Sequence, residues 1–184
     1  YIPSMVQFGG QTAINLSQSL DQEGMPILGS TADAIDTASD RGRFEDFLAH
    51  LGIPQPPGAG VTTLEEALKV AQGTGYPVLV RPSYVLGGRA MEIVQNATEL
   101  IRYVTAAAEL GISHPILIDK YLEGREVELD AICDGETVFI PGIMEHVERA
   151  GVHSGDSMAV YPDLTLTNSE VDSLVDYTTR IAIA

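Results

Sequence analysis

The sequence predicts an α/β fold whose second half is of α+β type, with antiparallel strands. Three observations predict this class. Apolar residues recur at helical spacing in several segments, and strand-like apolar runs alternate with these segments from residue 76 onward. Asp134-Gly135 separates two alternating runs, which is typical of a two-residue hairpin. The 184 residues suffice for one ordinary domain or two small ones, and the sequence contains no internal repeat.

Residues 1–37 have the pattern expected for the tail of a βαβ layer. We expect a short strand at residues 5–8, a loop entering a helix at residues 9–24, and a second strand at residues 25–30. Neither end of the sequence matches an ordinary terminus, and we expect the chain to be a piece of a longer protein.

A helix is expected to begin after Asp40, whose carboxylate suits an N-cap, and to end at Gly52. Its apolar face is formed by Phe44, Phe47, Leu48 and Leu51. A shorter helix at residues 62–75 has the spacing of a capping box, in which Thr62 or Thr63 pairs with Glu65 or Glu66.

The middle of the chain predicts two strands, at residues 76–85 and 89–94, joined at a glycine pair. A helix at residues 96–111, with Asn96 near its start, and an apolar strand at residues 115–122 follow.

The last third begins with the alternating hairpin at residues 126–146 and continues as a polar loop at residues 147–162. The final helix is expected at residues 167–184, capped by Asn168 or Ser169. Its apolar side is formed by Val171, Leu174, Val175 and Ile181.

Composition narrows the classes of partner. Ten basic against 26 acidic residues give a formal charge of -16, which repels a nucleic-acid backbone but still allows a local site for a small anion. No apolar run is long enough to cross a membrane, and the first residues lack a signal-peptide pattern. The single cysteine, Cys133, is expected to be a buried strand residue and fits a reducing cytoplasm.

The stretch RPSYVLGGRAMEIV places Arg81 and Arg89 on either side of the pair Gly87-Gly88. Glycine N–H groups can approach phosphate oxygens closely, and guanidinium groups match these oxygens with paired hydrogen bonds. An ordinary hairpin with solvated arginines explains the same residues, and sequence physics alone leaves both interpretations open.

Two further groups can contribute to a polar site. Glu126, Glu128 and Asp130 alternate along one strand and would share one of its faces. Such carboxylates would face solvent at a sheet edge, or would meet a cation, sugar hydroxyls or arginine. The loop GVHSGDS contains His153, for which a contact to ligand or backbone is a more natural role than general base.

These motifs resemble one family closely. YPVLVRPSYVLGGRAMEIV is similar to the ATP-grasp signature of carbamoyl-phosphate synthase large chains, and DAIDTASDRGRF, VELDAICDGE and GIMEHVERAGVHSGDS match the same family in the same order. The resemblance covers nearly the whole chain and favours the second of the two homologous synthetase halves. Two alternatives are another ATP-grasp ligase such as a biotin carboxylase, whose glycine loop usually differs, and a nucleotide-binding module without catalysis.

The resemblance implies a partial ATP-grasp fold at residues 38–184, with a lid at about residues 76–118, preceded by the tail of a Rossmann-like pre-ATP-grasp domain at residues 1–37. Arg41 and Arg81 correspond to positions that bind nucleotide phosphates, and Gly87 and Gly88 would cover these phosphates.

The remaining implied contacts concern the nucleoside. Lys120 and Leu122 fall on a hinge that contacts adenine, with backbone contact favoured at Lys120, and Glu126 matches the carboxylate that binds the ribose hydroxyls. The loop that lines the nucleotide corresponds to Gly151, Val152, His153 and Ser154.

The family uses ATP with Mg²⁺ or Mn²⁺ to phosphorylate bicarbonate and then carbamate, and it receives ammonia from a small glutaminase subunit. The resemblance therefore implies a cytoplasmic ligase of arginine or pyrimidine biosynthesis. Its metal ligands are expected beyond Ala184, so this chain alone is expected to hold neither catalytic residues nor metal ligands and to be inactive.

Overall fold

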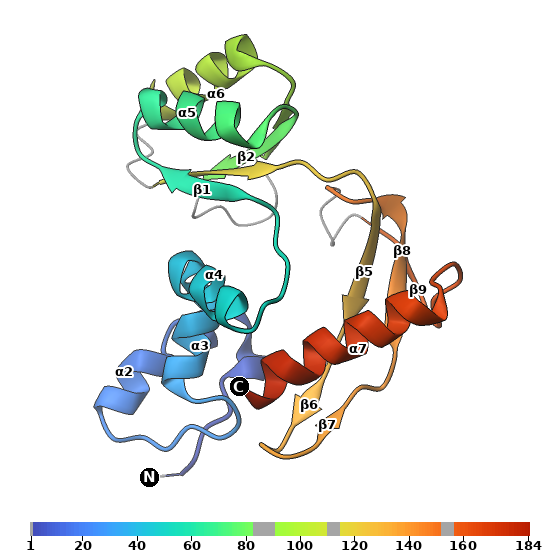
Figure 1. The fold of residues 1–184 in the computed structure, drawn as a ribbon. Helices are drawn as coiled ribbons and strands as arrows, with labels where there is room; N and C mark the ends of the chain where they lie inside the picture. The colour runs from blue at the N-terminus through green and yellow to red at the C-terminus, as the bar shows by residue number, and fades with distance from the viewer. Residues whose placement is uncertain (1, 83–90, 110–114, 152–156) are drawn as a thin grey trace. The chain divides into compact units, whose positions relative to one another are not determined.

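The computed structural model describes residues 2–82, 91–109, 115–151 and 157–184 (Figure 1). The chain divides into two compact units, one ending at Gln55 and the other beginning at Pro56. Prolines 54, 56 and 57 surround this division, in keeping with a linker that cannot continue a helix. The predicted domain boundary after residue 37 stays a prediction.

The first unit is helical. Its elements are the 3₁₀ helix η1 (Gln7–Gly9) and the helices α1 (Gly10–Ile14), α2 (Ser17–Gln22), α3 (Ala32–Ser39) and α4 (Arg41–His50). The strands predicted at residues 5–8 and 25–30 were wrong, because pairing there is reduced to one parallel bridge between Ser4 and Ile27. Pro3 and Pro26 adjoin these positions and lack an N–H group, which limits a longer ladder.

Helix α4 begins as predicted, because the Asp40 carboxylate accepts a hydrogen bond of 2.8 Å from the Arg43 amide. Helix α3 was not predicted from the sequence. Its start is capped by Thr31, whose side chain accepts from the Ala34 amide at 3.1 Å. The Arg43 guanidinium also pairs with Asp33 and Asp36, which fastens α4 to α3.

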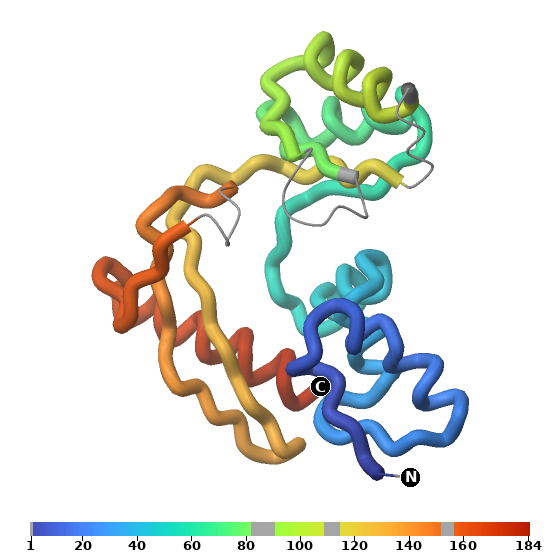
Figure 2. Tube along the Cα trace, turned by 180° about the vertical axis from the view of Figure 1, so that it is seen from behind, coloured from blue at the N-terminus to red at the C-terminus, as the bar shows by residue number. Residues whose placement is uncertain are grey.

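The first part of the second unit is a four-stranded sheet with two helices on one face. Its elements are β1 (Gly58–Val61), α5 (Leu64–Thr74), β2 (Val78–Pro82), β3 (Glu92–Val94), α6 (Ala97–Glu109) and β4 (Ile116–Lys120). The strands pair antiparallel in the order β1-β4-β2-β3. Both views show α5 and α6 side by side on one face of this sheet (Figures 1 and 2).

Alternation along β2 divides its side chains between the two faces of this sheet. Val78 and Val80 are fully buried in the core beneath the helices, together with Ile118 of β4. Leu79 and Arg81 therefore project from the other face, and Arg81 is exposed and level with Leu117. The capping box of α5 is confirmed as Thr63 with Glu66.

The second part of this unit is a three-stranded sheet with a two-stranded hairpin and one helix. Its elements are β5 (Arg125–Leu129), β6 (Ile132–Cys133), β7 (Val138–Phe139), β8 (Ile143–Arg149), β9 (Ala159–Val160) and α7 (Asn168–Ile183). Strands β5, β8 and β9 pair antiparallel in that order, and β6 pairs with β7. A turn at Asp134-Gly135 is confirmed: Gly135 has a φ of 96°, and the Asp134 carboxylate accepts from the amides of Glu136 and Thr137. The connection is longer than the predicted two residues, because residues 134–137 separate the paired Cys133 and Val138.

Three local predictions here were wrong. Residues 147–149 and 159–160 belong to strands rather than a loop, since β8 continues to Arg149 and pairs with β9. Helix α7 is capped by Thr167, which forms a capping box with Glu170, so the cap lies just before Asn168. Cys133 is half-buried rather than buried, in a two-residue strand beside the turn. Among the described residues, no helix is both long and apolar enough to span a membrane.

Candidate nucleotide-binding site

Six of the predicted site residues fall within the described part of the chain: Arg41, Arg81, Lys120, Leu122, Glu126 and Gly151. The other five, Gly87, Gly88, Val152, His153 and Ser154, lie outside the described residues, and their roles stay predictions. The same holds for Arg89 of the glycine stretch.

Arg41 is the first residue of α4 and belongs to the first unit. Its Nε donates to the Glu45 carboxylate one turn later, at 2.5 Å. This ion pair holds the guanidinium along its own helix, at the helix end where the dipole favours anions. Contact between Arg41 and a nucleotide held by the second unit stays a prediction.

Lys120 and Arg81 lie in adjacent strands but project from opposite faces of the sheet. Lys120 is level with Val78, on the helix side, and its Nζ donates to the carbonyl oxygens of Gly75 and Tyr76, each at 3.0 Å. These carbonyls follow the C-terminus of α5, where a positive charge is favourable. The Lys120 ammonium is therefore occupied within the fold, which favours a backbone role for this residue at the hinge.

The hinge after β4 lies against the turn after β8. The Tyr121 hydroxyl donates to the Ala150 carbonyl at 3.1 Å, and the Ala150 amide donates to the Gly124 carbonyl at 3.1 Å. Gly151 has a φ of 102°, and a Cβ there would lie 3.3 Å from a ring carbon of Tyr121. A side chain at this position would be strained and crowded, so glycine is the residue that permits this approach.

Leu122 leaves its side chain 54% exposed on the segment between β4 and β5. An apolar side chain so exposed beside a predicted adenine contact is available to cover an apolar ligand ring.

Glu126 lies on the face of β5 that is turned away from α7. Arg125 and Val127 on either side of it both line a pocket against α7, so Glu126 projects the other way by strand alternation. The β5–β8 register is irregular between Arg125 and Val127, and irregular register of this kind redirects a side chain. Glu126 is half-buried.

Sequence reasoning missed His146, a buried residue on the Glu126 side of the sheet. Its Nε2 lies 3.2 Å from the Glu128 carboxylate and its Nδ1 lies 2.7 Å from the Ser157 hydroxyl. His146 is therefore the partner of Glu128, one of the three alternating carboxylates predicted on this strand. Asp130, another of the three, follows the end of β5. The sequence GIMEH could have indicated His146. Adjacent residues of a strand face opposite sides of a sheet, so His146 lies on the side opposite the buried Glu145.

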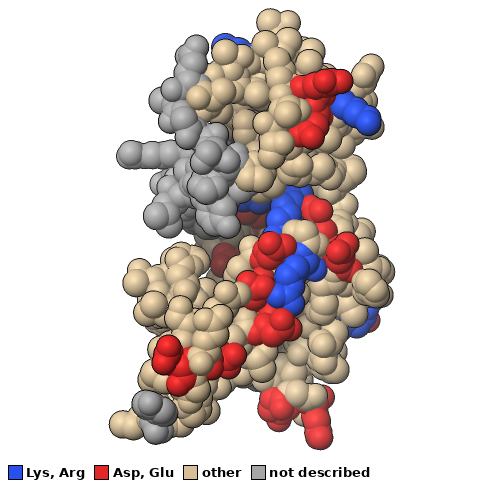
Figure 3. Space-filling view, turned by 90° about the vertical axis from the view of Figure 1, so that its left-hand side faces the viewer, with Lys and Arg blue, Asp and Glu red and all other residues tan. Residues whose placement is uncertain are grey.

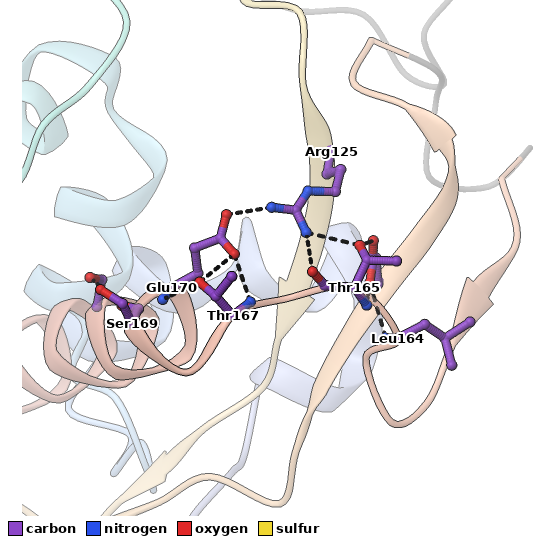
Figure 4. A network of polar contacts seen from close by, with 8 residues as sticks. Arg125, Leu164, Thr165, Thr167, Ser169 and Glu170 are labelled. Atoms are coloured by element: carbon purple, nitrogen blue, oxygen red, sulfur yellow. Dashed lines mark hydrogen bonds and ion pairs between the residues drawn. The ribbon is translucent and has the colours of Figure 1, made fainter.

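A polar network occupies the opposite, α7-facing side of the same strands (Figure 4). Arg125 donates through one nitrogen to both oxygens of Thr165, each at 2.8 Å, and pairs through another with Glu170. Glu145 of β8 accepts from the amides of Leu164 and Thr165, at 3.0 and 2.9 Å, and from the Thr165 hydroxyl.

Hydrogen bonding lowers the pKa of both carboxylates in this network. For Glu145 the Thr165 hydroxyl is the largest cause, followed by the Thr165 amide, and for Glu170 the largest causes are the amide and hydroxyl of Thr167. Both carboxylates are therefore held in the charged form, which accepts all of these hydrogen bonds.

The described residues contain no group of three or more His, Cys, Asp or Glu side chains placed to hold a metal ion. The face seen in Figure 3 carries more acidic than basic side chains, as the net charge leads one to expect.

A family model described as "Carbamoyl-phosphate synthase L chain, ATP binding domain" matches residues 40–184. The carbamoyl phosphate synthase large chain of Thermomicrobium roseum is 64% identical over 182 residues, which cover 99% of this chain and 17% of that protein. The chain thus spans 17% of the length of this curated relative.

Solved structures show the fold. The biotin carboxylase domain of Hydrogenobacter thermophilus 2-oxoglutarate carboxylase, in complex with MgADP, ADP and bicarbonate, matches 92% of this chain and 39% of its own, with TM-score 0.73 and 23% identity. D-alanyl-alanine synthetase A of Vibrio cholerae matches 91% and 54%, with TM-score 0.73 and 18% identity. Biotin carboxylase of Campylobacter jejuni matches 92% and 40%, with TM-score 0.71 and 21% identity. These likenesses confirm the predicted α/β, ATP-grasp fold class.

Proposed function

Because the chain belongs to the carbamoyl-phosphate synthase L chain ATP-binding domain family, we propose that it binds ATP in the second synthetase half of such a large chain. There the bound nucleotide would supply the γ-phosphoryl group that converts carbamate to carbamoyl phosphate. Two alternatives are a nucleotide-binding role without catalysis and another carboxylate-amine ligase. The family match over residues 40–184 supports the carbamoyl-phosphate synthase proposal better than either of them.

The observation that carries this proposal is the contact between the hinge and the turn at Gly151. The hinge with Lys120 and Leu122 and the turn with Gly151 are far apart in sequence, and the resemblance implies that each contacts the nucleotide. Hydrogen bonds from Tyr121 to Ala150 and from Ala150 to Gly124 join them in the fold. Such a junction between strands offers backbone groups and an apolar surface to one ligand.

The residues present fit a nucleotide in three ways. The Glu126 carboxylate accepts hydrogen bonds, as two adjacent ribose hydroxyls require. Arg81 is exposed on the face of its sheet opposite α5 and α6, and it offers a guanidinium to phosphate oxygens. The exposed Leu122 side chain and the backbone of Lys120 offer an edge for adenine.

We further infer the wider setting from the family. Mg²⁺ or Mn²⁺ would be held by residues beyond Ala184 together with the phosphates. The small glutaminase subunit, the rest of the large chain, and bicarbonate or carbamate would be the partners. The product would serve arginine or pyrimidine biosynthesis, and the single cysteine, Cys133, fits a cytoplasmic location.

The test is calorimetric titration of ADP into a longer chain that includes the metal ligands expected beyond Ala184, and into its Arg81→Ala variant. Loss of a charge-assisted contact to phosphate should weaken ADP binding by about 1.5–3 kcal/mol. Arg102→Ala is the matched control, because it removes an exposed arginine that pairs with Glu92 in the same part of the second unit.

The control should bind ADP like the parent. Equal affinity of Arg81→Ala and the parent would remove Arg81 from the phosphate site. Absence of any ADP binding by the parent would contradict the proposed function itself.

A further inference from the structure

Thr165 is hydrogen-bonded to side chains of β5, the strand that contains Glu126, and of β8, the neighbouring strand. Arg125, the residue before Glu126 on β5, donates to the carbonyl and hydroxyl oxygens of Thr165, each at 2.8 Å. Val127, the residue after it, is level with Glu145 of β8, which accepts from the Thr165 amide at 2.9 Å and from its hydroxyl. Both neighbours of Glu126 are therefore fastened, directly or across one strand pair, to the same residue.

The hydrogen-bonding capacity of Thr165 is closely matched to these partners. Its hydroxyl proton goes to Glu145, so its oxygen is left as an acceptor for Arg125, while its amide and carbonyl bond to the same two side chains. Substitution of either charged partner would leave polar groups of Thr165 without a bond.

A second arm holds Arg125 from α7. Its other nitrogen pairs with Glu170, which also closes the capping box at the start of that helix by accepting from the amide and hydroxyl of Thr167, at 2.7 and 2.8 Å. The Arg125 guanidinium is thus held between a loop carbonyl and a helix cap, a geometry in which its planar donors lose little freedom.

We propose that this clamp, formed by Arg125, Glu145, Thr165 and Glu170, is a positioning device that sets the Glu126 carboxylate for the ribose hydroxyls of the nucleotide. The proposal rests on the proposed function, since it concerns the same ligand. Arg125 and Glu170 line the pocket against α7, and Glu145 is level with Val127 of the same pocket. Strand alternation places Glu126 on the other face, so the clamp acts on it through the backbone of β5. At the irregular register beside Glu126 the ladder alone leaves the strand less constrained, and the clamp supplies the constraint.

The test compares the dissociation constants of ADP and 2′,3′-dideoxy-ADP by calorimetry. If a positioned carboxylate binds the ribose hydroxyls, the parent should bind ADP about tenfold more tightly than the dideoxy compound, or better. Glu126→Gln should reduce this ratio, which establishes its origin.

Arg125→Ala and Thr165→Val should also reduce the ratio, to about twofold or less, while the affinity for dideoxy-ADP changes little. A merely structural role would lower both affinities together and leave the ratio unchanged. Glu170→Gln is the milder variant should Arg125→Ala fail to fold, because an amide oxygen can still accept from Thr167 while the ion pair loses its charge. Its ratio should be intermediate.

Arg180→Ala is the matched control, since it also removes an arginine paired with an acid on α7, here Asp176. It should keep the ratio of the parent. A large parent ratio that persists in Arg125→Ala, Thr165→Val and Glu170→Gln would overturn the clamp and leave ATP binding intact. A parent ratio near one would remove Glu126 from the ribose and overturn the clamp as well, whereas failure of the parent to bind ADP would overturn the proposed function and the clamp with it.

Discussion

Two cations in adjacent strands have different roles because of strand alternation. Arg81 projects from the face of its sheet opposite the helices, whereas Lys120 projects toward the helices and donates to the carbonyls of Gly75 and Tyr76. Each residue follows a short apolar run, VLV before Arg81 and ILI with one aspartate before Lys120, so their charges look equivalent in sequence. Only the strand register in the fold distinguishes them: it makes Arg81 a candidate ligand contact and places Lys120 at the end of α5.

Lys120→Met should therefore affect stability more than nucleotide binding. It keeps the aliphatic stem but removes the donors to both carbonyls, and we expect the free energy of unfolding to fall by about 1–2 kcal/mol. ADP affinity should fall by no more than about fivefold, because we expect the hinge contact at this residue to be made by the backbone. Urea denaturation and calorimetry measure the two effects, and a larger loss of affinity than of stability would show that the ammonium itself contacts the ligand.

At the scale of elements, capping determines where the helices begin. Helices α5 and α7 are each capped by a threonine. Its side chain accepts a hydrogen bond from the amide of a glutamate three residues later, and the side chain of that glutamate accepts one from the threonine amide. These reciprocal bonds satisfy amides that have no partner within the helix. They also direct the chain into α5 over the sheet and into α7 beside the clamp.

Thr63→Ala should lower the free energy of unfolding by about 1 kcal/mol, since the Glu66 amide loses its acceptor. The measurement is the midpoint of urea denaturation. Thr105→Ala, on the exposed side of α6, is the control and should be neutral or slightly stabilising, because alanine is the better helix former there. Equal losses in the two variants would show that the cap contributes nothing.

The elements that were predicted correctly from sequence are those with a complete local signal. The α5 helix has both its apolar period and its capping box, and the Asp134-Gly135 hairpin has its turn residues. The strands at residues 5–8 and 25–30 failed because an apolar run does not show whether partners exist, and Pro3 and Pro26 limited the ladder. The clamp was not predicted, because strand pairing brings Arg125 and Glu145 together and Thr165 reaches them from the segment between β9 and α7, 40 residues beyond Arg125.

At the scale of the whole molecule, the charge of -16 opposes folding through repulsion between like charges, and each carboxylate with a specific partner offsets part of it. Acidification therefore has two opposite effects on this chain: it relieves general repulsion, and it removes the charge that specific hydrogen bonds require. The unfolding curve of the parent alone mixes the two. A comparison with a variant that differs at one carboxylate separates them, because the general term is nearly common to both proteins.

Glu145→Gln is the variant that isolates this effect. Hydrogen bonds from Thr165, and then from the Leu164 amide, hold the pKa of Glu145 below the unfolded value of 4.5, with Arg125 adding to the effect. A carboxylate with a lowered pKa contributes stability that is complete above the unfolded pKa and is lost as pH falls through the folded pKa. The parent should exceed the variant in free energy of unfolding by a constant amount above about pH 5.5, and the difference should shrink progressively at lower pH. Urea denaturation at several pH values measures it; a difference that stayed constant down to about pH 3 would mean that Thr165 does not depend on the charge of Glu145.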